Sequence, residues 1–224
     1  MAANLKEVRE RIKSVKNTQQ ITNAMKLVSA AKLRRAQQAI QQMRPYANKL
    51  NEMLRNILSN LDGDVDTEFG KERPVNKACI VVVTSNRGLC GAFNTNVSKA
   101  AIDLVENKYA DQRAKGNLSV MFLGKKGFDY FKNRYPDLNF IKDNMGIFSD
   151  LSFDNVATVA QALMTAFQEQ EFDAIDVAYG RFKNAAMQFA EAEQFLPVAK
   201  IENEEGGNAK ADYIFEPSKE GLKM

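Results

Sequence analysis

The 224-residue chain contains no histidine and no tryptophan. The absence of histidine removes the commonest general base and the commonest protein ligand for metal ions. The only two cysteines, Cys79 and Cys90, cannot form a disulfide framework, which indicates a reducing compartment with both thiols free. No stretch approaches the roughly 20 apolar residues of a membrane span, and the N-terminus lacks the apolar centre of a signal peptide. We therefore expect a soluble, intracellular protein that is not an enzyme by itself.

Acidic residues are absent from one long interval. Between Glu10 and Glu52 the sequence has nine lysines and arginines and not one Asp or Glu. Residues 1–61 hold 12 basic and 3 acidic side chains, whereas residues 62–224 hold 19 basic and 25 acidic ones. A basic arm attached to a mildly acidic body indicates an acidic partner for the arm.

The same interval carries the apolar repeat of a coiled coil. With Leu5 at heptad position a, 13 of the 17 a and d positions are apolar, where chance would give about eight. The 13 are Leu5, Val8, Ile12, Val15, Leu33, Ala36, Ile40, Met43, Ala47, Leu50, Leu54, Ile57 and Leu61, and the exceptions are Gln19, Thr22, Lys26 and Ser29. The repeat predicts one long helix over residues 1–61, roughly 85 Å at about 1.5 Å per residue. We expect a kink or interruption at Pro45, which cannot donate a hydrogen bond to the carbonyl of Gln41. Residues 62–224 contain no second pattern of that length, so the partner helix must come from another chain or from further sequence.

Residues 75–203 alternate between strand and helix patterns. Strands are predicted at 79–83, 118–124, 174–182 and 195–201, and helices at 94–110, 125–134 and 154–170. The run CIVVV at 79–83 is typical of a strand buried on both faces of a parallel sheet. We predict a Rossmann-like, three-layer α/β domain, joined to the helix by a linker at 62–74 and followed by a loop and terminal segment at 204–224.

The body lacks the pattern of a dinucleotide site. The first strand leads through Gly88 and Gly91 into a helix, but the G-x-G-x-x-G spacing is absent, and Lys125 lacks the flanking residues of a phosphate loop. Cys90 precedes a helix N-terminus, where a thiolate is favoured, but no base accompanies it. A flavodoxin-like enzyme with a helical appendage is therefore disfavoured. A basic coiled-coil protein that binds nucleic acid through its +9 arm stays open as the alternative.

Two stretches resemble one family. IKSVKNTQQITNAMKLVSAAKLRRAQ (12–37) and TSNRGLCGAFNTNV (84–97) are similar in sequence, order and separation to the gamma subunit of bacterial F-type ATP synthases. The resemblance implies a rotor subunit of the central stalk, which couples proton-driven rotation to ATP synthesis or hydrolysis inside a ring of alpha and beta subunits. It implies that the body contacts the epsilon subunit and the ring of c-subunits, as a peripheral protein on the cytoplasmic side of the bacterial inner membrane. Because the ATP chemistry belongs to the beta subunits, the resemblance implies no cofactor, small-molecule substrate or nucleic acid for this chain.

The resemblance also assigns residues to partner contacts. Met25 matches the family position near an acidic loop of the beta subunit, and the whole expected contact between rotor and stator is Lys16, Gln19, Gln20, Met25, Lys26, Lys32, Arg34 and Arg35. The part of the seam expected to pair with the subunit's own C-terminal helix is Val8, Ile12, Val15, Leu33, Ala36 and Ile40. The family's signature turn is Arg87, Gly88, Leu89, Cys90 and Gly91. The C-terminal helix should follow DYIFEPSKE, yet the sequence stops at GLKM. We therefore expect a truncated chain whose arm self-associates or is disordered in isolation.

Overall fold

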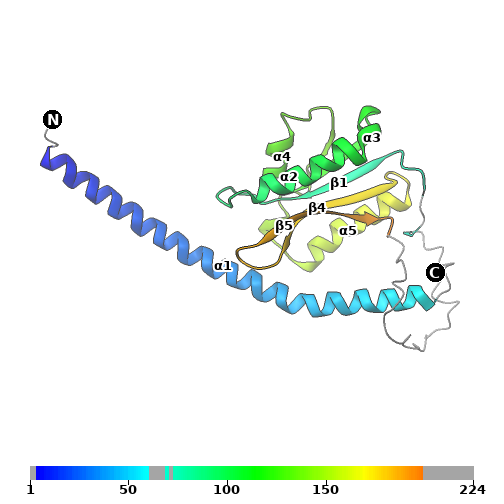
Figure 1. Ribbon diagram of the computed structural model, residues 1–224, viewed down its shortest axis with the longest axis horizontal. Coiled ribbons are helices and arrows are strands. Elements are labelled where there is room, and N and C mark those ends of the chain that lie inside the picture. The colour runs from blue at the N-terminus through cyan, green and yellow to red at the C-terminus, as the bar shows by residue number, and fades with distance from the viewer. Residues whose placement is uncertain (1–3, 61–68, 71–72, 199–224) are drawn as a thin grey trace. The chain divides into compact units, whose positions relative to one another are not determined.

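The computed structural model describes residues 4–60, 69–70 and 73–198, with only the backbone described for residues 54–60 (Figure 1). The elements form two compact units, α1 in one and the β-sheet with its helices in the other. In chain order they are α1 (Leu5–Asn60), β1 (Ala78–Val83), α2 (Phe93–Asp103), the π-helical turn η1 (Leu104–Lys108), α3 (Ala110–Ala114), β2 (Leu118–Leu123), α4 (Lys125–Phe131), β3 (Asn139–Ile141), the 3-10 turn η2 (Ile147–Ser149), α5 (Phe153–Gln168), β4 (Ala174–Phe182) and β5 (Gln188–Leu196). The predicted linker, 62–74, and terminal segment, 204–224, lie largely outside the described residues, so these boundaries stay predictions.

The long N-terminal helix is present as one element of 56 residues. The expected interruption at Pro45 does not occur, because α1 continues as an α-helix on both sides of that residue. Proline removes a single N–H donor, and in so long a helix the other backbone hydrogen bonds keep the two halves continuous. The ribbon of α1 curves along its second half instead of breaking (Figure 1).

The body is built on a five-stranded sheet in the order β3-β2-β1-β4-β5. β1 pairs in parallel with β2 and with β4, and β2 pairs in parallel with β3. β5 alone is antiparallel and forms a hairpin with β4. The central position of β1 confirms the interpretation of its apolar run, since Ala78 through Val82 are all buried. The predicted α/β fold class with a long N-terminal helix is therefore confirmed.

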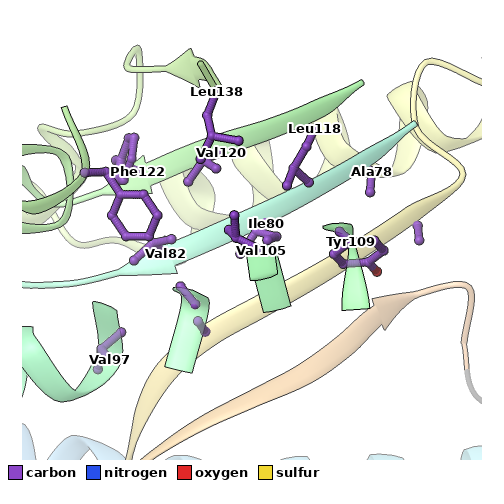
Figure 2. Close-up of a cluster of buried hydrophobic side chains, with 14 residues drawn as sticks. Ala78, Ile80, Val82, Val97, Val105, Tyr109, Leu118, Val120, Phe122 and Leu138 are labelled. Carbon is purple, nitrogen blue, oxygen red and sulfur yellow. The ribbon is translucent and has the colours of Figure 1, made fainter. Parts of the chain in front are cut away.

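Each face of the sheet has its own hydrophobic cluster, because side chains alternate between the faces of a strand. On one face Ile80, Val82 and Phe122 pack against the helical segment that supplies Val97 and Val105. Figure 2 shows these helical side chains directed at the strands from one side of the sheet. On the other face Cys79, Val81 and Met121 pack against α5 through Val159, Leu163 and Phe167. The result is the expected arrangement of three layers.

Two predicted elements were wrong in detail, and one strand was not predicted. The strand expected at 195–201 is β5 at Gln188–Leu196, because its register is set by the hairpin to β4, which Lys183 and Met187 close with a backbone hydrogen bond of 3.2 Å. Pro197 follows β5 and has no N–H to donate to a ladder. The single helix expected at 94–110 is divided by the π-helical turn η1, in which the N–H of Tyr109 donates to the carbonyl of Leu104. The short edge strand β3 was missed.

Candidate partner-binding surfaces

All eight residues expected at the contact between rotor and stator are exposed on α1. They do not share one side of the helix. At about 100° per residue, Lys16, Gln20 and Arg34 lie on one side, whereas Met25 and Lys32 lie on the opposite side. These residues could therefore touch partners only if the partners surround the helix, and their contact role stays a prediction.

Five basic side chains in the middle of α1 differ from those at its ends. At the ends of the acid-free interval, Arg11 meets Glu7 at 2.7 Å and Lys49 meets Glu52 at 3.0 Å. Within the described residues no ion pair involves Lys16, Lys26, Lys32, Arg34 or Arg35. The middle of α1 therefore presents uncompensated positive charge.

The predicted seam of α1 is open to solvent along the helix. Val15 is 67% exposed and Ile12 is 51% exposed, and Leu5, Val8, Leu33, Ala36, Met43 and Leu50 are also exposed. Ile40 and Ala47 are half-buried, and the side chains of Leu54, Ile57 and Leu61 lie outside the described residues. So many exposed apolar side chains along one winding stripe of a helix indicate an association surface.

Where polar residues interrupt the seam, the hydroxyls of Thr22 and of its neighbour Thr18 bond within the helix. The hydroxyl of Thr22 donates to the carbonyl of Thr18 at 2.8 Å, and the hydroxyl of Thr18 donates to the carbonyl of Ser14 at 3.0 Å. Hydrogen bonds of this kind let a hydroxyl lie on a helix without an external partner. This part of the helix, with Gln19, Thr22, Lys26 and Ser29 at the seam positions, can therefore face another helix while the hydroxyls of Thr18 and Thr22 keep their hydrogen bonds.

The signature turn, Arg87, Gly88, Leu89, Cys90 and Gly91, connects β1 to α2. The side chain of Asn94 holds it, accepting from the N–H of Ser85 at 2.9 Å and donating to the sulfur of Cys90 at 3.1 Å. Leu89 has a φ of 63° and is 99% exposed, so the turn presents an apolar side chain directly to solvent. The sulfur of Cys90 also lies 3.9 Å from the Ser85 hydroxyl and 4.0 Å from the carbonyl of Arg87, so these contacts all lie between Ser85 and Asn94.

At the edge of the sheet where a Rossmann fold binds a nucleotide, two glycines lie in close contact with the chain's own groups. A Cβ at Gly180 of β4 would lie 2.4 Å from the ring of Phe93, which therefore packs directly over that strand. At Gly124, which has a φ of +107°, a Cβ would lie 2.1 Å from the carbonyl oxygen of Thr84. The N–H of Gly127 also donates to the Thr84 hydroxyl at 2.8 Å. These contacts join the carboxyl ends of the strands to one another instead of leaving a phosphate cradle.

Two ion pairs of the body were not found from the sequence. Arg73 donates through Nε to Asp173 at 2.6 Å and through Nη2 to the carbonyls of Phe167 (2.7 Å) and Phe172 (2.6 Å). Its guanidinium also lies 4.3 Å from the centre of the Phe167 ring. Partners 100 residues apart leave no local pattern, so only the fold could reveal this clamp.

The Asp173 carboxylate is held by the backbone as well. Burial acts to raise its pKa, but the N–H groups of Lys77 and Asn76, together with Arg73, outweigh burial and leave the pKa of Asp173 below its usual value. These N–H groups donate at 3.0 and 2.9 Å. The clamp therefore depends on an ionised carboxylate.

The second ion pair joins the end of η1 to β4. Lys108 donates to both oxygens of Asp176 at 3.0 and 2.7 Å and to the side-chain oxygen of Gln194 at 3.3 Å. Asp176 is almost fully buried on β4, whereas Lys108 is part-exposed. Burial, followed by the nearby Asp176 carboxylate, raises the pKa of Tyr109 above its ordinary value. The pair ties the π-helical turn to β4 and β5.

The structure contains no other candidate centre of chemistry in its described part. Residues 4–60, 69–70 and 73–198 hold no cluster of three or more His, Cys, Asp or Glu side chains suited to a metal ion. Within the same residues, no helix combines the length and apolarity that crossing a bilayer requires. Among the residues expected from the sequence, the exposed surfaces are α1 and the turn that presents Leu89.

Comparisons with known proteins agree on one family. A family model described as ATP synthase matches residues 4–223. The ATP synthase gamma chain of Flavobacterium psychrophilum is 52% identical over 222 residues, which are 99% of this chain and 74% of that protein. The gamma chain of Christiangramia forsetii is 48% identical over 217 residues, 97% of this chain and 73% of that protein.

Solved structures show the same fold at lower identity. The chain matches a structure of the rotor of Euglena gracilis mitochondrial ATP synthase with a TM-score of 0.53 and 24% identity, covering 83% of this chain and 60% of that one. It matches a structure of the central stalk and c-ring of Tetrahymena thermophila mitochondrial ATP synthase with a TM-score of 0.58 and 21% identity, covering 91% and 84%. The chain thus spans less than two thirds of its Euglena counterpart.

Proposed function

Because the chain belongs to the ATP synthase gamma-chain family, we propose that it acts as a rotor subunit of the central stalk. The observation that carries the proposal is α1, a helix of 56 residues with an exposed apolar stripe and with five exposed basic side chains in its middle that have no ion pair among the described residues. A rotating shaft needs a stiff element that binds a second helix along one stripe and slides against its surroundings elsewhere. No comparison supports the nucleic-acid-binding alternative.

The proposed partners follow from the two kinds of surface on α1. The apolar stripe fits a C-terminal helix of the same subunit, and the matched relatives are longer than the matched region. The basic side chains fit acidic loops of the alpha and beta subunits, which would surround the shaft. The epsilon subunit and the c-ring are proposed to contact the α/β body and to hold the chain at the membrane surface.

The chain is proposed to contribute no catalytic group. The support is that Phe93 packs against Gly180 at the edge of the sheet where a Rossmann fold binds a nucleotide. Its role is then mechanical, and the ATP chemistry takes place in other subunits. Exposed ion pairs between shaft and head would each contribute about 0–1 kcal/mol, which permits them to break and re-form as the shaft turns.

The proposal is tested by reversing charge on the arm. In an ATP synthase assembled with the complete gamma subunit, Arg34→Glu with Arg35→Glu should reduce proton-driven ATP synthesis severalfold, because both side chains would then repel acidic loops. The measurement is the rate of proton-driven ATP synthesis divided by the rate of ATP hydrolysis, each determined for the same complex under matched conditions.

The matched control reverses two exposed lysines of the body, Lys99→Glu with Lys115→Glu. This change alters the net charge equally but leaves the arm intact, so synthesis should stay near the wild-type rate. Unchanged coupling in the arm variant, in a complex that assembles normally, would refute the contact role of Arg34 and Arg35. Failure of the wild-type subunit to assemble with alpha and beta subunits would refute the rotor function itself.

A further inference from the structure

A group of apolar side chains is exposed on the body where α5 begins. Phe153 is 84% exposed and Leu151 is 65% exposed, while Val156 is 42% and Phe148 is 37% exposed. All four lie within nine consecutive residues, spanning η2, the following turn and the first turn of α5. We refer to these four side chains as the α5 apolar cluster.

The turn that carries the cluster is fixed by hydrogen bonds. The Asn155 side chain donates to the carbonyl of Asp150 at 2.9 Å and to its carboxylate at 3.1 Å. The Ser152 hydroxyl caps α5 by accepting from the N–H of Asn155 at 3.4 Å. With Ser152 as the N-cap, Leu151 and Val156 occupy the two sequence positions of a hydrophobic staple. The staple does not account for Phe153, which lies on the first turn with most of its ring in solvent.

The chain segment that carries the cluster is acidic and lies between Lys142 and Arg181. From residue 143 to residue 180 the sequence has seven Asp and Glu and no Lys or Arg. Asp173 and Asp176 are used in the ion pairs with Arg73 and Lys108. Asp143, Asp150 and Asp154 are exposed, and none of them has an ion pair among the described residues. The α5 apolar cluster therefore belongs to a stretch of chain with three exposed carboxylates, two of which, Asp150 and Asp154, alternate in sequence with its apolar residues.

We infer that the α5 apolar cluster is a docking surface for a protein segment that inserts apolar side chains and carries lysine or arginine around them. Apolar anchors would supply the binding energy, and opposite charge at the rim would select and orient the partner. A membrane surface is disfavoured, because anionic lipid headgroups would be repelled by three exposed carboxylates. The inference rests on the proposed function, since the segment is expected from another subunit of the same assembly.

The first experiment places a photoreactive aromatic residue in the cluster. Phe153 is replaced by p-benzoylphenylalanine in the complete subunit within an assembled ATP synthase, and Glu169, exposed just beyond the far end of α5, is replaced in the control. Irradiation should join position 153, and not position 169, to one other subunit at a peptide rich in Lys or Arg. Cross-linking to lipid, to a second copy of this chain or to its own α1 would overturn the inference. So would no cross-link at position 153 in an intact complex.

The second experiment separates the apolar and charged contributions. The measured quantity is the affinity of the complex for the subunit that the first experiment identifies. Phe153→Ser should weaken this affinity about fivefold or more. Asp150→Asn with Asp154→Asn should weaken it about two- to tenfold and should make the affinity less dependent on salt. The matched control, Glu169→Gln with Glu171→Gln, removes the same charge at the other end of α5 and should leave this affinity unchanged. Equal effects of both charge variants, or no effect of Phe153→Ser, would overturn the inference. If the wild-type complex does not assemble at all, the proposed function fails instead.

Discussion

Replacing Arg73 by alanine tests whether the clamp at the entry to the body is a main source of its stability. The change removes the bond to Asp173 and both bonds to the carbonyls of Phe167 and Phe172. It leaves a carboxylate that is only 10% exposed, with two backbone N–H groups as its remaining donors. The native state should therefore lose more stability than it would from an ordinary surface ion pair.

The magnitude follows from the burial of the pair. Breaking a fully buried ion pair costs about 3–5 kcal/mol. The Arg73 side chain is 22% exposed, so water can partly replace it, and we expect a loss of about 2–3 kcal/mol. Arg113 provides the matched control, because it pairs with Asp137 at 2.7 Å and lies 4.9 Å from the Tyr135 ring. That pair is 30% and 46% exposed, so Arg113→Ala should cost about 0–1 kcal/mol.

The assay must report on the body and not on α1. The chain has no tryptophan, and α1 dominates any helical signal. Hydrogen exchange of the β1 amides during urea titration avoids both problems, because β1 lies at the centre of the sheet. Equal losses in the variants of Arg73 and Arg113, within about 0.5 kcal/mol, would refute the reasoning from burial.

The same pair predicts a dependence on pH. The folded-state pKa of Asp173 is lowered, so its contribution to stability is present above the unfolded value of about 3.9 and is lost as pH falls through the folded-state pKa. The difference between wild type and Arg73→Ala should therefore be complete at pH 7 and shrink at the acidic end. A difference that grows on acidification would contradict an ionised Asp173.

Two further predictions concern single positions of the body. Gly124→Ala should destabilise the body by about 3 kcal/mol or more, because a Cβ would meet the Thr84 carbonyl in a left-handed backbone conformation, and a wild-type urea midpoint would contradict this. At neutral pH a thiol reagent should modify Cys90 quickly and leave Cys79 unmodified until the chain unfolds, since burial raises the pKa of Cys79 to about 12. Rapid modification of both thiols in the native chain would show that β1 is less protected than its burial implies.

The sequence by itself determined the elements whose signals are local. The heptad repeat predicted α1, the run at 79–83 predicted the central strand, and the alternation at 174–182 predicted β4 with its observed bounds. The signature turn and the basic arm pointed to the family that the comparisons show. Such patterns are readable because periodic burial leaves its mark on consecutive residues. The contact roles of the arm residues rest on resemblance and stay predictions.

Tertiary structure decided what depends on partners far along the chain. β5 falls at 188–196 because the hairpin with β4 sets its register, and the sequence at 195–201 carries no information about that pairing. The π-helical turn brings Lys108 to Asp176, and Arg73 meets Asp173 across 100 residues, so neither pair has a local pattern. Pro45 shows a further limit of local signals, because the helix continues through the proline without the break that the sequence allowed, whereas the expected kink there stays a prediction. Non-local contacts are selected by the energy of the whole fold, which no window of sequence contains.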